Sequence, residues 1–160
     1  MASLFSVVVL TYNQAKLVEA TLESIHQQSY PSIELIISDD GSQDGTPQVV
    51  ERWLSRFGER FVRCQFLTST QNTGISANHN RGVKAARGEF LKYIGGDDIL
   101  LSNALERMAE FLERNPEVQV ATSFIQPFIS RENGEILETL SLIPESWAVK
   151  VLGNDANTQF

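Results

Sequence analysis

The stretch IELIISDDGS, Ile33 to Ser42, joins an apolar run directly to a pair of acidic residues. A continuous run of β-branched and other apolar residues is typical of a strand that is buried on both faces, as in a parallel sheet. The stretch KYIGGDDILL, Lys92 to Leu101, repeats this arrangement and places Asp97-Asp98 after two glycines. Adjacent carboxylates repel each other and are costly to bury unpaired, so we expect a cation or hydrogen-bond donors beside both pairs.

Strand-like and helix-like segments alternate along residues 1–124. The predicted strands are FSVVVL (5–10), IELIIS (33–38), RFVRCQFL (60–67), EFLKYI (89–94) and VQVATSF (118–124). Between them lie segments with apolar residues at helical spacing, and Trp53 belongs to one of these apolar stripes. This alternation predicts an α/β domain with a mostly parallel sheet and right-handed crossovers.

The pattern changes after residue 124. Asn133-Gly134 lies between two strand-like runs, and this dipeptide is the strongest short signal for a β-hairpin. The segment after the hairpin shows no clean period. We therefore divide the chain into an α/β region, residues 1–124, and a second region, residues 125–160, that begins with a hairpin.

Composition excludes several classes of function. The net charge of −7 argues against a general nucleic-acid binder, because such binding depends largely on Lys and Arg at phosphates. The single cysteine, Cys64, excludes an intrachain disulfide and a cysteine zinc site. No run of 18 apolar residues and no signal-peptide pattern is present, which predicts a cytoplasmic location, with the inner face of the membrane as the alternative.

Polar clusters follow the predicted strands at their carboxyl ends. They are TYN (11–13), DDGS (39–42), NTG (72–74) and GGDD (95–98). In an open α/β sheet, ligands bind outside the carboxyl ends of the strands. The sequence therefore predicts a single site at this edge, with the two acidic pairs as neighbours across one crevice.

The residue types in these clusters suit a nucleoside diphosphate held with a divalent cation. Tyr12 offers a ring on which a base can stack, and Asp39 or Asp40 can accept a hydrogen bond from an imide N–H. Asp97 and Asp98 provide hard oxygen ligands for Mg²⁺ or Mn²⁺ bridging phosphates. Each cluster alone has a structural alternative, such as a solvated turn, a helix cap or a cover over a strand end. Their combination at matching strand ends favours a binding site.

Three segments, VVVLTYNQ, IELIISDDGSQDGT and NTGISANHNRGVKAARGEFLKYIGGDD, resemble family 2 glycosyltransferases. Together they cover most of positions 5–100. The resemblance implies the A-type glycosyltransferase fold, a three-layer α/β/α, Rossmann-like fold with a mostly parallel sheet. It also implies a role in the biosynthesis of cell-envelope polysaccharides.

By this resemblance, Tyr12 stacks on the base of the donor and Asp40 bonds to the edge of that base. The nucleotide-binding residues that it implies are Thr11, Tyr12, Asn13, Asp39, Asp40, Asn78, Arg81 and Asp97. The implied metal ligands, for Mg²⁺ or Mn²⁺, are Asp98 and Asp97. Two departures stand out: many relatives carry an acidic residue where Gly95 stands, and many carry Arg where His79 stands, with Arg81 or Lys84 as alternative cations here.

The resemblance predicts an enzyme that transfers a sugar from a nucleotide-diphosphate sugar, UDP-linked, to a hydroxyl of a carbohydrate or lipid-linked acceptor, with inversion. Residues 1–124 would bind the donor, and residues 125–160 would begin an acceptor-side region that is truncated here. The general base is expected beyond Phe160, because Glu132, Glu135 and Glu138 flank the predicted hairpin.

Two alternatives come from other classes. The first is a nucleotide- or sugar-binding module without catalysis. The second is a phospho-receiver or a dinucleotide-binding domain. A receiver needs its carboxylates after the first strand, and a dinucleotide site needs a glycine-rich turn there. Because TYNQAK, residues 11–16, contains neither, the second alternative is disfavoured.

Overall fold

The computed structural model describes residues 2–123, 125–131 and 136–140. It divides the chain into two compact units, Met1–Pro116 and Glu117–Phe160. The boundary predicted at residue 124 separates a donor-binding region from an acceptor-side region, and this functional division stays a prediction. Among the described residues, no helix is long and apolar enough to cross a membrane.

The first unit is built on a four-stranded sheet, in which all neighbouring strands are parallel. Its strands are β1 (Phe5–Thr11), β2 (Ile33–Asp39), β3 (Arg63–Thr68) and β4 (Phe90–Gly95), in the order β3-β2-β1-β4. The predicted parallel α/β sheet is therefore confirmed. The central strands β1 and β2 are almost wholly buried, which agrees with their continuous apolar runs.

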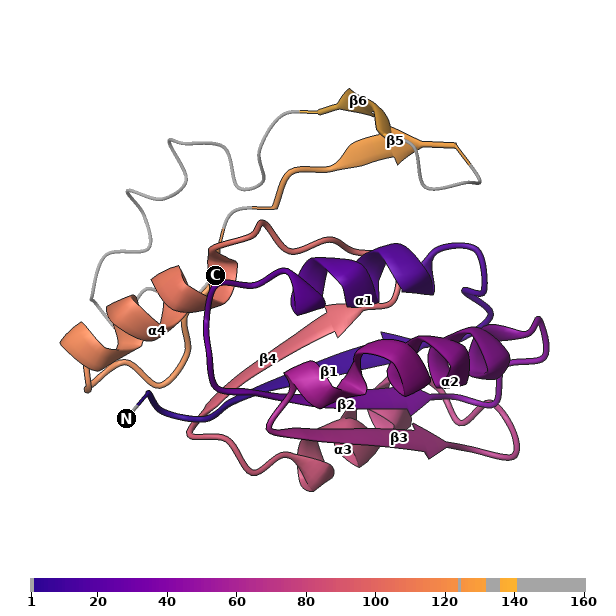
Figure 1. The fold of residues 1–160 in the computed structure, drawn as a ribbon, viewed down its shortest axis with the longest axis horizontal. Coiled ribbons are helices and arrows are strands. Elements are labelled where there is room, and N and C mark those ends of the chain that lie inside the picture. Colours follow the sequence, from indigo (N-terminus) through magenta and orange to yellow (C-terminus); the bar gives the residue numbers. More distant parts are fainter. Residues whose placement is uncertain (1, 124, 132–135, 141–160) are drawn as a thin grey trace. The chain divides into compact units, whose positions relative to one another are not determined.

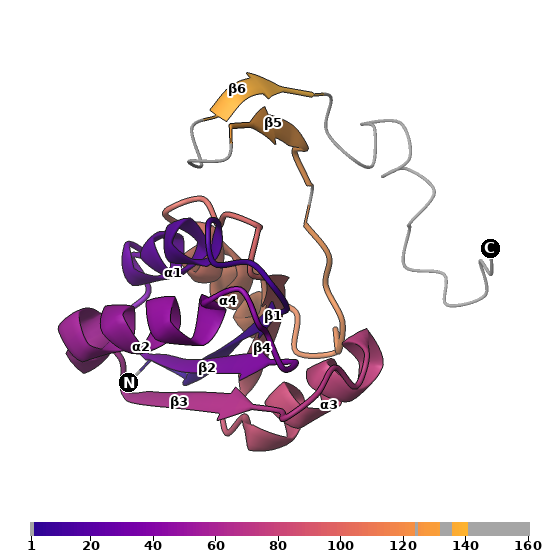
Figure 2. The same ribbon diagram turned by 90° about the vertical axis from the view of Figure 1, so that its right-hand side faces the viewer.

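Helices cover both faces of this sheet, and together they make the three layers (Figures 1 and 2). The helical segments are α1 (Val18–His26), α2 (Thr46–Phe57), the short 3-10 helix η1 (Gly58–Arg60), α3 (Ile75–Ala85) and α4 (Ala104–Arg114). Figure 2 shows α1 and α2 on one face and α3 on the other. Trp53 of α2 is 2% exposed and belongs to the main core, as its place in an apolar stripe predicts.

Helix α3 lies very close to the sheet at Gly82. A Cβ at this position would lie 2.4 Å from Cγ1 of Val8, a buried residue of β1. Glycine is therefore required by close packing, since any larger side chain would push α3 off the sheet. This close approach brings the side chains of α3 within reach of the ends of β1 and β2.

A buried carboxylate, that of Glu34, stabilises the C-terminal end of α3 against the sheet. Glu34 of β2 is fully buried and accepts hydrogen bonds from Ser6 Oγ (2.6 Å) and from the backbone N–H of Arg87 (2.9 Å). It also forms an ion pair with Arg63 of β3. The Arg63 guanidinium donates in turn to the carbonyl of Ala85, the last residue of α3 (3.2 Å). A network that includes both charges thus ties the sheet to the end of this helix.

The second unit contains an antiparallel pair of strands, β5 (Phe128–Ser130) and β6 (Ile136–Thr139). The predicted hairpin is confirmed in its two strands, while Asn133-Gly134 lies outside the described residues. The predicted strand at 118–124 is wrong for residues 118–123, which form no strand. An apolar alternation makes a strand only where a neighbour supplies backbone hydrogen bonds, and these six residues have no such neighbour among the described strands.

Candidate functional site

The two acidic pairs flank the end of β1, because β1 lies between β2 and β4 in the sheet. Thr11 is in register with Asp39 on one side, and Leu10 is in register with Gly95 on the other. Beyond the strands, Asp40 N donates to Thr11 O (3.0 Å) and Gly96 N donates to Leu10 O (2.8 Å). The sheet order thus brings the clusters that follow β1, β2 and β4 to one edge.

Asp39 points into the protein and binds its own neighbours. It is 1% exposed, and its Oδ1 accepts hydrogen bonds from Thr11 Oγ1 (2.8 Å) and Ser42 Oγ (2.5 Å). Its Oδ2 accepts from Ser42 N (2.9 Å). These contacts hold the end of β1 to the loop after β2. Asp39 and Thr11 therefore support the site through hydrogen bonds inside the protein.

Asp40 is also buried, and four donors surround it. Its Oδ1 accepts from Thr73 Oγ1 (2.5 Å) and Arg81 Nη2 (3.2 Å), and its Oδ2 accepts from Thr73 N (2.9 Å) and Gly74 N (2.7 Å). A carboxylate has about four lone-pair positions, and these donors occupy all of them. Burial raises the pKa of Asp40, but the hydrogen bonds from Thr73, Arg81 and Gly74 outweigh it and hold the pKa below its ordinary value.

Asn78 and Arg81 extend from α3 to this edge of the sheet and form hydrogen bonds around the acidic pair Asp39-Asp40. Asn78 is 3% exposed, donates to Thr11 O (3.3 Å) and accepts from Ser38 Oγ (2.7 Å). The Arg81 guanidinium donates to Asp39 O (3.1 Å) as well as to the Asp40 carboxylate. Arg81 is therefore the cation that compensates the charge of Asp40.

The loop after β1 is held by the loop after β2, and this leaves Tyr12 on the surface. Asn13 adopts a left-handed backbone conformation, φ 52°, which Asn tolerates better than most residues. Its N–H donates to Ser42 Oγ (2.8 Å), and Ala15 N donates to Asp44 Oδ2 (2.9 Å). Tyr12 is 45% exposed and free to present its ring to a ligand.

Sequence reasoning missed the supporting roles of Asp44 and Thr46 in the β2–α2 loop. Asp44 accepts from Thr46 N (3.0 Å) and Thr46 Oγ1 (2.5 Å), so it orders the entry to α2 while it holds the loop after β1. The only signal was the turn-forming composition of GSQDGTP, residues 41–47, which identifies a loop but not its partners.

The carboxylates of Asp97 and Asp98 converge over Gly95 at the exposed end of β4. A Cβ on Gly95 would lie 2.7 Å from Asp97 Oδ1 and 3.1 Å from Asp98 Oδ2. The Gly95 N–H donates to Asp98 Oδ2 at 3.3 Å, a long hydrogen bond. Both side chains are exposed, so two hard oxygen donors border one open space. This donor set fits Mg²⁺ or Mn²⁺.

A hollow of about 300 Å³ also lies at this edge, and sequence reasoning missed it. His79 and Tyr93 line it with perpendicular rings, whose centroids are 4.7 Å apart. The remaining lining residues are Leu10, Ile75, Ser76 and Asn80. No sequence signal could have found this hollow, because α3 and β4 meet there only through the fold.

Acid should weaken the fold through three hydrogen-bonded carboxylates, of which Asp40 and Asp44 lie at this edge of the sheet and Glu34 lies at its opposite end. The pKa values of Glu34, Asp40 and Asp44 are raised by burial, but hydrogen bonds outweigh this and lower them from 4.5, 3.8 and 3.8, respectively. A lowered pKa gives stability that is fully present above the unfolded value and is lost as the pH falls through the folded value. We expect the free energy of unfolding, measured with urea, to be level near neutral pH and to fall below about pH 4.5. A constant value down to pH 3 would contradict this.

Comparison with known proteins finds glycosyltransferases similar to this chain in sequence. Over 105 residues, the chain is 37% identical to a β-1,3-glucosyltransferase of Campylobacter jejuni that acts on GalNAc(5)-diNAcBac-PP-undecaprenol; the match covers 66% of this chain and 33% of that protein. Over 143 residues it is 30% identical to a putative teichuronic acid biosynthesis glycosyltransferase, TuaG, of Bacillus subtilis, covering 89% of this chain and 54% of TuaG. The chain thus spans about a third to a half of the length of these relatives.

Solved structures of glycosyltransferases share the fold. Residues 1–349 of S. aureus TarS with UDP superpose with a TM-score of 0.64 at 29% identity, over 71% of this chain and 33% of that one. A mannosyltransferase from Pyrobaculum calidifontis, solved with GDP-Man and Mn²⁺, gives a TM-score of 0.61 at 28% identity, over 68% of this chain and 31% of that one.

The fold predicted from the resemblance, a nucleotide-sugar-binding fold of the A type, is therefore confirmed. The model of the family described as "Glycosyl transferase family 2" matches residues 6–149, which is most of the chain. This chain belongs to glycosyl transferase family 2.

Proposed function

We propose that this chain is the donor-binding part of an inverting glycosyltransferase, and that it binds a UDP-linked sugar together with Mg²⁺ or Mn²⁺. The observation that carries the proposal is the pairing of β1 with β4. This pairing sets the exposed ring of Tyr12 and the converging carboxylates of Asp97 and Asp98 at the end of neighbouring strands. Solved relatives with UDP, with UDP-GlcNAc and with GDP-Man and Mn²⁺ support this reading.

The base of the nucleotide sugar would stack on Tyr12. It would also form a hydrogen bond to Asp40, by replacing one of the hydrogen-bond donors that already surround this carboxylate. Because four hydrogen bonds already occupy the lone pairs of the Asp40 carboxylate, an imide N–H can bond to it only if one of these hydrogen bonds is broken. Arg81 makes the longest of the four bonds (3.2 Å) and keeps Asp39 O, Asn78 Oδ1 and Thr73 Oγ1 as acceptors. We therefore expect Arg81 to be the donor that withdraws, at the cost of separating its charge from that of Asp40. Asn13 would border the same pocket. Thr11, Asp39 and Asn78 would support it from the protein interior through their hydrogen bonds.

The acidic loop would hold the diphosphate end of the donor. Asp98 and Asp97 would hold the divalent cation, and Asp97 would also face the ribose or the phosphates. When bound, the cation supplies positive charge that stabilises the leaving diphosphate. Without it, two carboxylates would face a diphosphate of the same sign, and such contacts are unfavourable.

The acceptor would be a hydroxyl of a carbohydrate or a lipid-linked carbohydrate; the name of the Campylobacter relative gives a lipid-linked acceptor for that protein. The chain's own residues bind and orient the donor, while a general base that deprotonates the acceptor would belong to a further part of the protein. We propose a cytoplasmic location for this activity, with the inner face of the membrane as the alternative.

UDP binding should depend on a divalent cation. Removing the cation with EDTA, or changing Asp98→Asn, should weaken UDP binding by about tenfold or more, roughly 1.4 kcal/mol, because the phosphates lose their partner of opposite charge. Tyr12→Ala should weaken binding by a comparable amount through lost stacking, while the dependence on the cation remains. Calorimetry with UDP, with and without Mn²⁺, measures both effects.

Two outcomes would refute this reading. Equal UDP affinity with Mn²⁺ and with EDTA would mean that Gly95–Asp98 is only a structural turn. Tighter binding of GDP than of UDP would leave the nucleotide site in place but contradict the UDP-linked donor. Glu51→Ala, at an exposed position on α2, serves as the control and should bind UDP as the unchanged chain does.

A further inference from the structure

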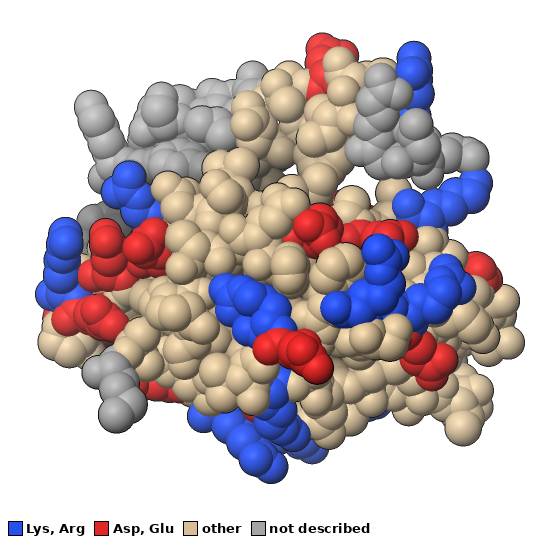
Figure 3. Space-filling view, viewed as in Figure 1, with Lys and Arg blue, Asp and Glu red and all other residues tan. Residues whose placement is uncertain are grey.

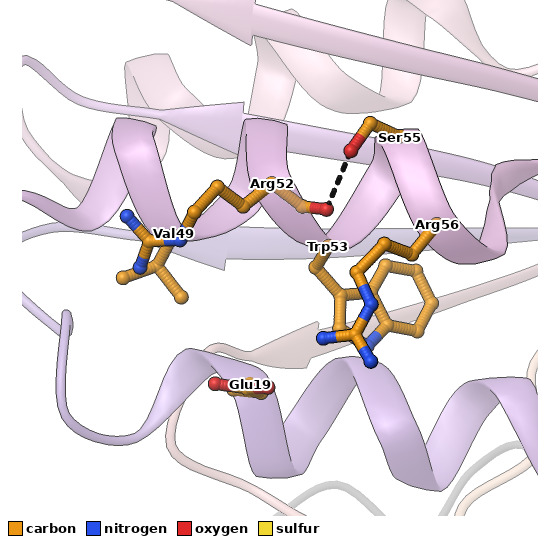
Figure 4. A pocket seen from close by; sticks show the side chains of 6 residues that line it. All are labelled: Glu19, Val49, Arg52, Trp53, Ser55 and Arg56. Carbon is orange, nitrogen blue, oxygen red and sulfur yellow. Dashed lines mark hydrogen bonds between the residues drawn. The ribbon is translucent and has the colours of Figure 1, made fainter.

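A small pocket lies between α1 and α2, and none of its residues belongs to the acidic loops or to the predicted nucleotide site. Its volume is about 160 Å³. It is lined by Glu19 of α1 and by Val49, Arg52, Trp53, Ser55 and Arg56 of α2. Figure 4 shows the Trp53 indole behind the Arg56 guanidinium, with Glu19 on the facing helix.

The Trp53 indole N–H has no acceptor among the described residues. The residue is 2% exposed, and its Nε1 is a donor only. A buried donor that makes no hydrogen bond is costly, so native structures leave few of them. An acceptor that enters the pocket from solvent would remove this cost.

Two arginines line the pocket, and Figure 4 shows the Arg56 guanidinium beside the Trp53 indole and the Arg52 guanidinium beside Val49. Arg52 and Arg56 are one helical turn apart and lie on the same side of α2. Within the described residues, neither Arg52 nor Arg56 takes part in an ion pair. The Arg56 guanidinium lies over the Phe57 ring, 5.0 Å from its centroid, which orients it without neutralising its charge. On the face that Figure 3 shows, basic and acidic side chains are interspersed over α1 and α2.

We propose that this pocket binds the phosphate group of a small ligand, either inorganic phosphate or a phosphate monoester. Arginine forks suit phosphate oxygens, because their N–H groups form pairs of charge-assisted hydrogen bonds. The indole N–H supplies a further donor from the floor of the pocket. Glu19 sets the affinity, since its carboxylate lines the same pocket and repels an anion.

The Ser55 hydroxyl is not a ligand in this arrangement. It donates to the carbonyl of Arg52 at 2.8 Å, a contact drawn in Figure 4. The site therefore rests on the two guanidinium groups and the indole N–H, and each of these can be changed separately.

Nuclear magnetic resonance of the ¹⁵N-labelled chain tests the proposal through its indole N–H signals. The sequence has two tryptophans, Trp53 and Trp147, and Trp53→Phe assigns their signals by removing one. Inorganic phosphate added at constant ionic strength should shift the Trp53 signal in a saturable way, while chloride should not. Glycerol phosphate distinguishes a monoester from the free ion, according to which of them saturates at lower concentration.

Three variants make the outcome specific. Arg52→Gln and Arg56→Gln should each weaken phosphate binding by about tenfold, because each removes charge-assisted bonds. Glu19→Gln should strengthen it, because the like charge is gone. UDP affinity should not change in any of them, so failure here and failure of the proposed function are distinguishable.

Two results would overturn the proposal. One is a Trp53 signal that does not move at about 50 mM phosphate, since that excludes even millimolar affinity. The other is a Trp53 indole signal that shifts with pH but not with phosphate concentration. The His26 ring lies perpendicular to the indole with centroids 6.0 Å apart, so such a result would mean that the N–H responds to His26.

Discussion

Glu34→Ala is expected to lower the free energy of unfolding by about 3–5 kcal/mol, the usual cost of removing one partner of a buried ion pair. Glu34 is fully buried, and the change leaves Arg63, Ser6 Oγ and the Arg87 N–H without their common acceptor. Because this network holds the end of α3, the variant should also loosen Asn78 and Arg81 at the candidate site. Urea unfolding at neutral pH measures the stability, and UDP calorimetry measures the effect on binding.

A double-mutant cycle separates the buried charge from the lost packing. Combining Glu34→Leu with Arg63→Met removes both charges and should cost less than the sum of the two single changes, because no charge is left unpaired. Glu51→Ala, at an exposed position, should stay within about 0.5 kcal/mol of the unchanged chain. A loss below about 1 kcal/mol for Glu34→Ala would show that solvent reaches this carboxylate.

Asp40→Ala is expected to be the second most damaging change, with a loss of about 2–4 kcal/mol. It deprives the N–H of Thr73 and that of Gly74 of their carboxylate and removes the counter-charge of Arg81. Asp97→Asn is the matched control, since that carboxylate is exposed, and its stability should stay within about 0.5 kcal/mol. The measurement is again urea unfolding.

UDP binding by a milder variant tests the proposed exchange at Asp40. Arg81→Lys keeps a positive charge near Asp40 but loses the guanidinium fork. If the base displaces Arg81 from the carboxylate, this variant should bind UDP at least as well as the unchanged chain. Weaker UDP binding in a variant that remains folded would mean that Arg81 itself contacts the ligand or orders the site, and the exchange would be wrong.

The sequence by itself determined the fold class and the edge at which a site could lie. Long apolar runs such as Phe5–Leu10 are typical of strands buried on both faces, and their alternation with helical segments predicts a parallel sheet covered by helices. The polar residues that follow each run are local to the strand ends, and the strand direction places them at one edge. Tyr12, Asp97 and Asp98 were predicted as site residues in this way, and their roles stay a prediction.

Only the tertiary structure decided what surrounds each carboxylate. Asp39 and Asp40 are neighbours in sequence, but Asp39 turns to Thr11 and Ser42, whereas Asp40 turns to Thr73, Gly74 and Arg81, 33 to 41 positions away. Glu34 is likewise a lone charge in an apolar strand, and only the fold shows that Arg63 on the next strand is its partner. Hydrogen bonds depend on distance and direction between elements that α/β crossovers bring together, and no local pattern in the chain records those distances.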